Sequence, residues 1–477
     1  MNPRSEQKPL LNTMPSTRTN RRGFLRAAAT TLAALPLWSA TRGISAQRAS
    51  AEPATPAAVP VSLDIKEFGA VGDGKTNDTL AIQQALDRCS VLGGGQVRVP
   101  AGDYLIGAIT LHSNTTLHLD ADASLLGSPN LADYPITQVR WEGHWVKGYI
   151  GLVSAIDATN IGLTGSGRIV GSPAIKGRVD AQSGMRHPAL LEFVNCSGLR
   201  VEDCVTEQND MWSIHPVYCD NILFRNVTVR GGADGIDVDS CRHVVIESCT
   251  FSTGDDCISL KSGRGAEGYA LHRPTEDVRI RNCTFADSHW ACIGIGSETS
   301  GGIRNVHIDR CKCIAARTFA IYIKSRPGRG AFIEDIYVSD LDVSGAEQGF
   351  LRLNILNSGK QDDFAVPGQE GIPTIRNFNF NKIRVTDVPV LVDGVGIDPD
   401  KPLDGFSLTD ITGTCGKGIF LANIKHAVLR NIEVTGYSGA LLNTYNVSGV
   451  GLAKSVPLEP TKIPAPIPPP AQPYSLH

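Results

Sequence analysis

A short β-rich segment recurs through most of the chain, and this recurrence limits the fold more than any other feature. Each copy alternates apolar with polar residues around a central polar pair and then enters a turn. The clearest copies are LRVEDCVTEQ (199–208), ILFRNVTVRG (222–231), VVIESCTFST (244–253), VRIRNCTFAD (278–287), VHIDRCKCIA (306–315) and IYVSDLDVSG (336–345). Weaker copies are IGLTGSGRIVG (161–171), FNFNKIRVTD (378–387) and VLRNIEVTG (428–436). A period of roughly 20 to 30 residues with short strands is typical of a solenoid. We therefore predict an all-β parallel β-helix over residues 62–450.

Alignment of the copies places small apolar residues in one column. Its members are Cys204, Val227, Cys249, Cys283, Cys311 and Leu341. Cys219 and Cys241 form a second column. Because equivalent strands of neighbouring coils stack about 4.8 Å apart, disulfides between them are conceivable. Core packing explains the whole set more simply, since Val and Leu share the column, and we expect free thiols that fill the bore of the helix.

The two ends of the repeat region have a different character. Asp78 is a candidate N-cap for a helix whose apolar face contains Ile82, Ala85 and Leu86. One amphipathic helix ahead of a solenoid would cover its open apolar end. The proline-dense residues 455–477 cannot continue a hydrogen-bonded ladder, and we expect them to be extended and disordered.

The N-terminus resembles an export signal. NRRGFLRAAATTLAALPLWSA joins Arg21 and Arg22 to an apolar run, as in twin-arginine signal peptides. The alternative is a short buried helix behind a basic tail. We expect residues 1–46 to be removed and the protein to be periplasmic or secreted. Twin-arginine substrates fold in a reducing cytosol, which agrees with free thiols.

The predicted mature chain limits the partners that we expect. Removal of residues 1–46 takes away seven Lys/Arg and one Glu, which changes the net charge from −3 to −9. An acidic chain without a basic run is not a nucleic-acid binder. No later segment is long and apolar enough to span a membrane. We expect a monomer with a polysaccharide or oligosaccharide substrate and no cofactor or metal.

One turn of the repeat gathers acidic residues. Counted from the cysteine column, the same positions hold Asp234, then Asp255 and Asp256 in TGDDCISLKSG, then His289. Asp-Asp pairs also occur in solvated loops, but stacking on successive coils is not expected of scattered surface acids. Clustered carboxylates repel one another, so one retains a proton while its neighbours are ionised. Glycoside hydrolysis needs this combination, and an imidazole can tune the acid or hold the substrate.

Four segments resemble glycoside hydrolase family 28, the polygalacturonase group of right-handed β-helices. They are GADGIDVDSC (232–241), TGDDCISLKSG (253–263), IGSETSGGIRNV (295–306) and AIYIKS (320–325). The resemblance covers roughly residues 62–450. It implies an inverting hydrolase of galacturonate-containing polysaccharide, with Asp255 as proton donor and Asp234 and Asp256 as water activators. Coil spacing alone does not decide between inversion and retention.

The chain departs from the family pattern in three places. The usual Asn-Thr before the first aspartate is Gly232-Ala233, and His289 stands in SHWACIGIGS rather than in a Gly-His-Gly stretch. The family's Arg-Ile-Lys, which binds a substrate carboxylate, is Tyr322-Ile323-Lys324.

These departures leave the substrate-binding set open. We expect Lys261 and Lys324 to supply positive charge near the acids and Tyr322 to stack on a sugar. The missing charge could come instead from Arg317, Arg326 or Arg352. His215, with Trp212 in WSIHP, belongs either to the core or to the wall of the cleft.

Two other functions fit the same solenoid. A pectate-type lyase would use a base and usually Ca²⁺, for which Asp234, Asp237 and Asp239 could imitate a site. We expect Asp237 and Asp239, which run along a strand, to lie outside the acidic cluster. A non-catalytic adhesin or sugar-binding module would instead show ladders of outward Asn, Thr or aromatic residues.

Overall fold

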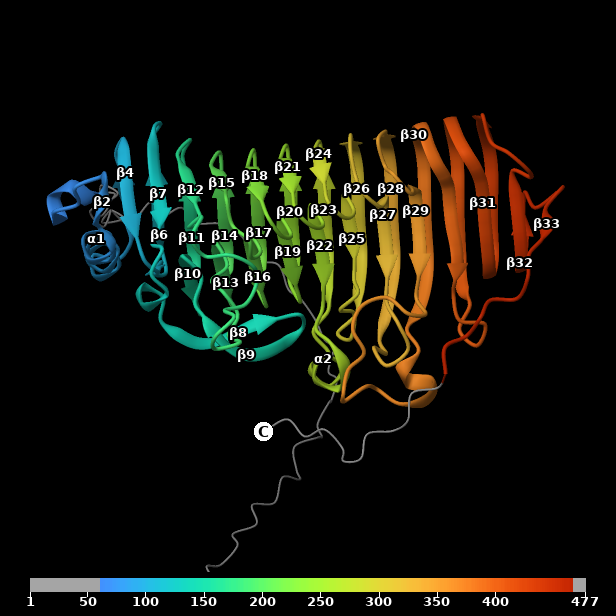
Figure 1. Cartoon of the computed structure of the whole chain (residues 1–477), viewed down its shortest axis with the longest axis horizontal. Coiled ribbons are helices and arrows are strands. Elements are labelled where there is room, and N and C mark those ends of the chain that lie inside the picture. Colours follow the sequence, from blue (N-terminus) through green and yellow to red (C-terminus); the bar gives the residue numbers. More distant parts are fainter. Residues whose placement is uncertain (1–60, 466–477) are drawn as a thin grey trace, which may run out of the picture. The chain divides into compact units, whose positions relative to one another are not determined.

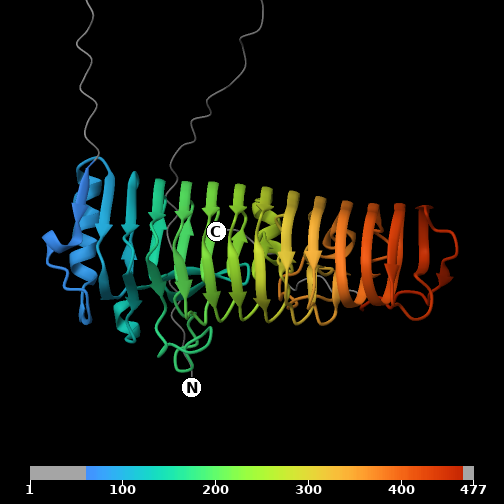
Figure 2. The ribbon, with the colours of Figure 1, turned by 90° about the horizontal axis from the view of Figure 1, so that it is seen from above.

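The computed structural model describes residues 61–465, which form a parallel β-helix as predicted. The predicted signal peptide and residues 466–477 of the predicted tail lie outside the described residues. Coils follow one another along the solenoid from α1 to β33, and successive strands of each side stack in register (Figures 1 and 2). No helix in the described range is long and apolar enough to cross a membrane.

Each early coil contributes one strand to each of three sides. The first side contains β5 (Ile109–Thr110), β10 (Val153–Ile156), β13 (Leu191–Val194), β16 (Ile214–Val217), β19 (Ile236–Asp239), β22 (Ile258–Lys261), β25 (Ile293–Ile295), β27 (Phe319–Lys324) and β29 (Gly349–Asn354). The second contains β1 (Ser62–Asp64), β3 (Gly95–Val99), β6 (Thr115–Leu119), β11 (Thr159–Thr164), β14 (Ser197–Glu202), β17 (Asp220–Arg225), β20 (Arg242–Glu247) and β23 (Thr275–Arg281). The third contains β2 (Asp73–Asn77), β4 (Gly102–Ile106), β7 (Ala123–Gly127), β12 (Arg168–Val170), β15 (Val205–Glu207), β18 (Thr228–Gly231), β21 (Thr250–Thr253) and β24 (Thr284–Ser288).

Later strands run through more than one side of a coil. They are β26 (Ile303–Cys313), β28 (Phe332–Val343), β30 (Thr374–Gly396), β31 (Leu403–Thr435) and β32 (Leu442–Val450); the last strand, β33 (Val456–Pro457), has two residues. Three short 3-10 turns also occur, at Ile65–Phe68, Leu131–Asp133 and Gly368–Gly371.

The predicted cysteine column lies in the bore. Its residues are at most 1% exposed, and the backbone of each coil bonds to the one before it, as in Thr250 N–H to the Val227 carbonyl. The twelve cysteines are all free and buried. The predicted core packing of the thiols is thus confirmed.

Helix α1 (Thr79–Val91) covers the N-terminal end of the solenoid, and Ile82, Ala85 and Leu86 are fully buried beneath it. Asp78 occupies the N-cap position as predicted, but its side chain does not cap the helix. Asp78 makes no cap hydrogen bond, because its carboxylate accepts the N–H groups of Val71 (2.7 Å) and Gly72 (2.9 Å). The helix start is therefore tied to the preceding turn rather than capped locally.

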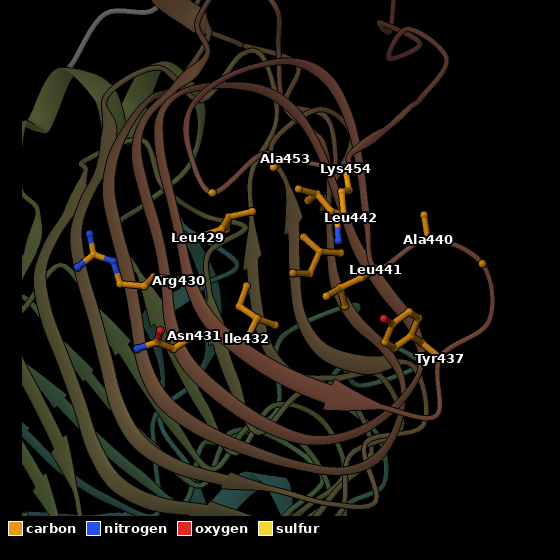
Figure 3. Close-up of a pocket in the computed structure, with 13 residues that line it drawn as sticks. Leu429, Arg430, Asn431, Ile432, Tyr437, Ala440, Leu441, Leu442, Ala453 and Lys454 are labelled. Atoms are coloured by element: carbon orange, nitrogen blue, oxygen red, sulfur yellow. The ribbon is translucent and has the colours of Figure 1, made fainter.

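The first part of the proline-rich tail is ordered, contrary to the prediction. Strand β33 pairs with β32, and Leu458 N–H donates to the Thr444 carbonyl (2.9 Å). Proline is tolerated here because β33 is the last strand of the sheet and needs no donor on its outer side. A cavity of about 530 Å³ lies near the C-terminal end of the solenoid, lined by Leu429, Leu441 and Leu442 together with the polar residues Arg430, Asn431 and Lys454 (Figure 3).

Three insertions leave the coils on one side of the solenoid (Figure 1). They are the hairpin of β8 (Ile136–Trp141) and β9 (His144–Tyr149), helix α2 (Gly265–Leu271), and the loop 355–371. Buried ion pairs join them to one another and to β19. We call this group the insertion clamp; its residues are Arg140, His144, Asp239, Arg264, Glu267, Arg329 and Asp362.

Candidate active site

The first side of the solenoid brings the predicted acids together. Ile236 of β19 pairs with Ile258 of β22, so Asp234 and Asp256, each two residues earlier, occupy equivalent places on neighbouring coils. They open onto a cavity of about 120 Å³. The lining residues are Glu142, Arg178, Trp212, Asp234, Asp255, Asp256, Lys261, Gly296, Ser297, Glu298 and Lys324. Five of the eight predicted site residues are among them.

Asp256 is the most tightly held of the three acids. Its Oδ2 accepts hydrogen bonds from Lys324 Nζ (2.6 Å) and Ser259 Oγ (3.0 Å), and its Oδ1 accepts the Ala291 N–H (3.1 Å). Burial raises the pKa of Asp256 to about 6, although Lys324 opposes the shift. Gly294 leaves the space, because a Cβ there would lie 2.3 Å from Asp256 Oδ2. Asp256 can thus gain or lose a proton near neutral pH.

Asp234 and Asp237 share one lysine and respond to it differently. Lys261 Nζ lies 3.0 Å from Asp234 Oδ2 and 2.9 Å from Asp237 Oδ2. Although burial acts against it, Lys261 lowers the pKa of Asp234, whereas burial prevails at Asp237 and raises its pKa well above the usual range. The expectation that Asp237 lies outside the cluster was therefore wrong. Asp239, two residues further along the same face of β19, pairs with Arg140 instead.

Asp255 has a partner that the repeat did not indicate. Its Oδ2 accepts a hydrogen bond from Arg178 Nη2 (2.5 Å), and its Oδ1 accepts the Asp256 N–H (3.0 Å). Arg178 comes from the loop 171–190, which interrupts the repeat between β12 and β13. A loop outside the aligned columns carries no positional signal, so sequence analysis missed Arg178.

Together these groups form what we call the active-site cluster. Its acids are Asp234, Asp237, Asp255, Asp256 and Glu298, and its cations are Arg178, Lys261 and Lys324. Acids outnumber cations, and burial also raises the pKa of Glu298 against the effect of Lys261. In the described residues, no three His, Cys, Asp or Glu side chains are grouped so that they could hold a metal ion.

The structure does not bring His289 into the cavity. Strands β21 and β24 pair Phe251 with Phe285 but Ser252 with Asp287, so the later coil contains one extra residue. This bulge shifts His289 away from the predicted place beside the acids. Its imidazole is 45% exposed, and its Nε2 lies 3.7 Å from Asp287 Oδ2. The predicted column was wrong here because the bulge has no mark in the sequence.

His215 and Tyr322 also lie outside the cavity lining. His215 is 1% exposed, packs on Trp212 with a ring separation of 4.4 Å, and lies 3.4 Å from Glu192 Oε1. Burial lowers the pKa of His215. Of the two places left open for the WSIHP residues, His215 therefore takes the core and Trp212 the wall of the cavity.

Tyr322 is nearly buried on the first side of the solenoid. Its hydroxyl lies 3.0 Å from Ser358 Oγ, Lys324 Nζ and the Arg352 guanidinium each lie 5.5 Å from the ring centre, and the residue is 7% exposed. A ring enclosed in this way does not offer a free face for sugar stacking. Of the three arginines considered as replacements, Arg352 is the one that contacts this ring.

A parallel β-helix that stacks carboxylates beside cations in one cavity has the features of a glycosidase site. The profile of the family "Glycosyl hydrolases family 28" matches residues 89–363. A Vitis vinifera protein named "Probable polygalacturonase" is 30% identical over 376 residues, which cover 74% of each chain. The chain belongs to glycosyl hydrolases family 28, and it is a glycosidase.

Solved structures share the fold. The exopolygalacturonase from Thermotoga maritima is 26% identical with a TM-score of 0.65, and the match covers 79% of this chain and 92% of that one. The family 28 exopolygalacturonase of Yersinia enterocolitica is 19% identical with a TM-score of 0.67, and the match covers 82% and 78%. The predicted right-handed parallel β-helix is thus confirmed.

Proposed function

We propose that this glycosidase hydrolyses galacturonate-containing, pectin-like polysaccharide. The observation that carries the proposal is the cavity itself, which combines Asp234, Asp255 and Asp256 with Arg178, Lys261 and Lys324. The carboxylates provide acid and base groups, and the cations suit an anionic sugar. The names of the family 28 relatives point to the same substrate class.

The contacts of the acids suggest how the reaction is divided. Asp255, which is partly exposed, donates a proton to the glycosidic oxygen. Asp256 and Asp234 activate the water that attacks the anomeric carbon; the lowered pKa of Asp234 keeps it ionised. In the family pattern this arrangement inverts the anomeric configuration, and the product's configuration can be read by NMR.

The shape of the cavity favours attack at a chain end. Glu142, at the tip of the β8–β9 hairpin, is part of the lining, and it is bound by Lys360 (2.7 Å) of the loop 355–371. Two insertions therefore meet beside the acids, where an open groove would let a polysaccharide pass. Both solved relatives described above are named exopolygalacturonases. We propose exo action.

Export by the twin-arginine route remains part of this proposal. The paired arginines and the following apolar run support it. We propose a periplasmic or secreted monomer, with residues 1–46 removed. N-terminal sequencing of the exported protein and its elution volume in size-exclusion chromatography would test both points.

The activity test is a panel of pectic and other plant polysaccharides scored for new reducing ends. Hydrolysis of polygalacturonate, with monomer or dimer as the early product, is the expected result. An increase in absorbance near 235 nm would reveal an unsaturated product and favour the lyase. Binding without new reducing ends would favour a degenerate, non-catalytic module.

A further inference from the structure

Both carboxylate oxygens of the residue that we assign as proton donor already accept hydrogen bonds. Arg178 Nη2 donates to Asp255 Oδ2 (2.5 Å), and the Asp256 N–H donates to Asp255 Oδ1 (3.0 Å). An arginine guanidinium can only donate hydrogen bonds, so Oδ2 cannot present a proton to a leaving group while it accepts from Arg178. A general acid must carry a proton when the leaving group departs. The contact with Arg178 therefore has to break before Asp255 can act.

The backbone of Arg178 is held in place, whereas its side chain is free to exchange its hydrogen-bond partner. Its backbone is fixed, because the Gly177 N–H donates to Asp210 Oδ2 (2.8 Å) and the His187 N–H donates to the Arg178 carbonyl (2.9 Å). Its side chain is 37% exposed, and within residues 61–465 the guanidinium has Asp255 as its hydrogen-bond partner. The guanidinium can thus turn to another carboxylate while the loop stays in place.

The other two cations of the cavity are less available. Lys324 is bound to Asp256 and Lys261 to two aspartates, and their side chains are 13% and 9% exposed. A guanidinium also has the planar, two-pronged geometry that matches a carboxylate, whereas an ammonium is a point charge. Arg178 is therefore the best-placed receptor for an acidic sugar.

We propose that Arg178 binds the substrate's galacturonate carboxylate and thereby releases Asp255 as the proton donor. This inference rests on the proposed function. The guanidinium exchanges one carboxylate for the other, and Asp255, left facing the charges of Asp234, Asp256, Glu142 and Lys324, takes a proton from solution. That proton passes to the glycosidic oxygen as the C–O bond breaks. Water adds to the anomeric carbon and loses its proton to Asp234 or Asp256, which returns it to solution.

Such an exchange makes substrate charge a condition for chemistry as well as for binding. A neutral sugar or a methyl-esterified galacturonate brings no carboxylate to Arg178, so Asp255 stays paired with Arg178. Discrimination against the ester should consequently appear in kcat and not only in KM.

Kinetics on galacturonate oligosaccharides and their methyl esters test the role of Arg178 in specificity. In Arg178→Gln, we expect the preference in kcat/KM for the free acid to fall by about tenfold or more, as for loss of a charge-assisted hydrogen bond. Arg178→Lys should restore part of it. An unchanged preference in Arg178→Gln, in an enzyme that still cleaves polygalacturonate, overturns the inference but leaves the proposed function intact.

Binding of galacturonate itself tests the exchange without turnover. Asp255→Asn removes the internal competitor, so this variant should bind galacturonate at least several-fold more tightly than the wild type. The double variant Asp255→Asn, Arg178→Gln should lose this gain. A gain that persists without Arg178 would show a general effect of charge and would contradict the exchange. A wild type that neither binds nor cleaves any galacturonide overturns the proposed function.

Discussion

Strand β19 contributes one aspartate to each of two charged clusters, and the pKa values of the two aspartates shift in opposite directions. Asp239 belongs to the insertion clamp, where Arg140 Nε lies 2.9 Å away and, against the effect of burial, lowers the pKa of the carboxyl. Asp237 belongs to the active-site cluster, where it shares Lys261 with Asp234 and burial raises its pKa. Two residues along one strand thus separate a carboxyl with a lowered pKa from one with a raised pKa.

The ratio of acids to cations explains the difference. In the clamp, Asp239, Glu267 and Asp362 are matched by three arginines, and His144 bridges Glu267 and Asp362. Hydrogen bonds to both acids raise the pKa of His144 although burial lowers it. In the active-site cluster, five acids share three cations, and burial raises the pKa of Asp237, Asp256 and Glu298. Matched charges hold structure, whereas an excess of acid provides the protons for catalysis.

The largest effect is expected from a change in the active-site cluster. Asp255→Asn keeps the shape of the side chain and removes the donated proton, so turnover should fall by about 10² to 10⁴. Because Asp255 is partly exposed, the thermal unfolding temperature should be nearly unchanged. Assays of reducing ends and circular dichroism check both points. Activity above about a tenth of wild type would refute the assignment.

A clamp variant should show the opposite pattern. Asp362→Ala leaves the buried Arg329 and the largely buried Arg264 without their shared acid. Breaking a buried ion pair costs about 3–5 kcal/mol, so the insertions should open locally and be cut more readily in limited proteolysis. Opening beside the cavity should also release longer oligosaccharides. Asp363→Ala, at an exposed position of the same loop, is the matched control. If both the proteolysis pattern and the products were unchanged in Asp362→Ala, the clamp would not be the feature that restricts the enzyme to chain ends.

The pH profile measures the excess of acid directly. Asp256 must be ionised to activate water, and its pKa is about 6. Below that pH, kcat/KM should fall by about tenfold per pH unit, since only the ionised fraction reacts. Lys324 opposes the upward shift of this pKa, so Lys324→Met should move the acid limb to higher pH. An acid limb that lies well below pH 6 would mean that Asp234, whose pKa is lowered, is the base without Asp256.

Features that recur with each coil could be predicted from the sequence. The fold, the thiol-filled bore and the stacking of Asp234 with Asp256 follow from a regular step between coils, which alignment of the copies recovers. His289 was misplaced because a β-bulge adds one residue without changing the local pattern of apolar and polar side chains. A single inserted residue is enough to move a side chain out of a site.

Features that depend on insertions could not be predicted. Arg178 reaches Asp255 from a loop, and the clamp joins segments that lie more than a hundred residues apart, such as Arg140 and Glu267. No period relates these positions, and their pairing is decided only when the solenoid brings the insertions to one side. The enclosed ring of Tyr322 likewise depends on Ser358 in a loop. Sequence patterns locate the coils, and tertiary contacts between insertions complete the site.

The smallest effect is expected in the bore, where neither cluster extends. Cys249 is buried and stacks between Val227 and Cys283 in the confirmed column. Because valine already occupies the neighbouring coil, Cys249→Val conserves volume approximately and should change the free energy of unfolding by less than about 1.5 kcal/mol. Activity should remain at the wild-type level, since the residue contacts neither cluster. Alkylation of the denatured protein without reductant should also modify all twelve cysteines if the protein has no disulfide. A loss of more than about 3 kcal/mol in Cys249→Val would show that the thiols contribute more than volume, for example through the sulfur-to-carbonyl contact of Cys249 with Glu247 (3.3 Å).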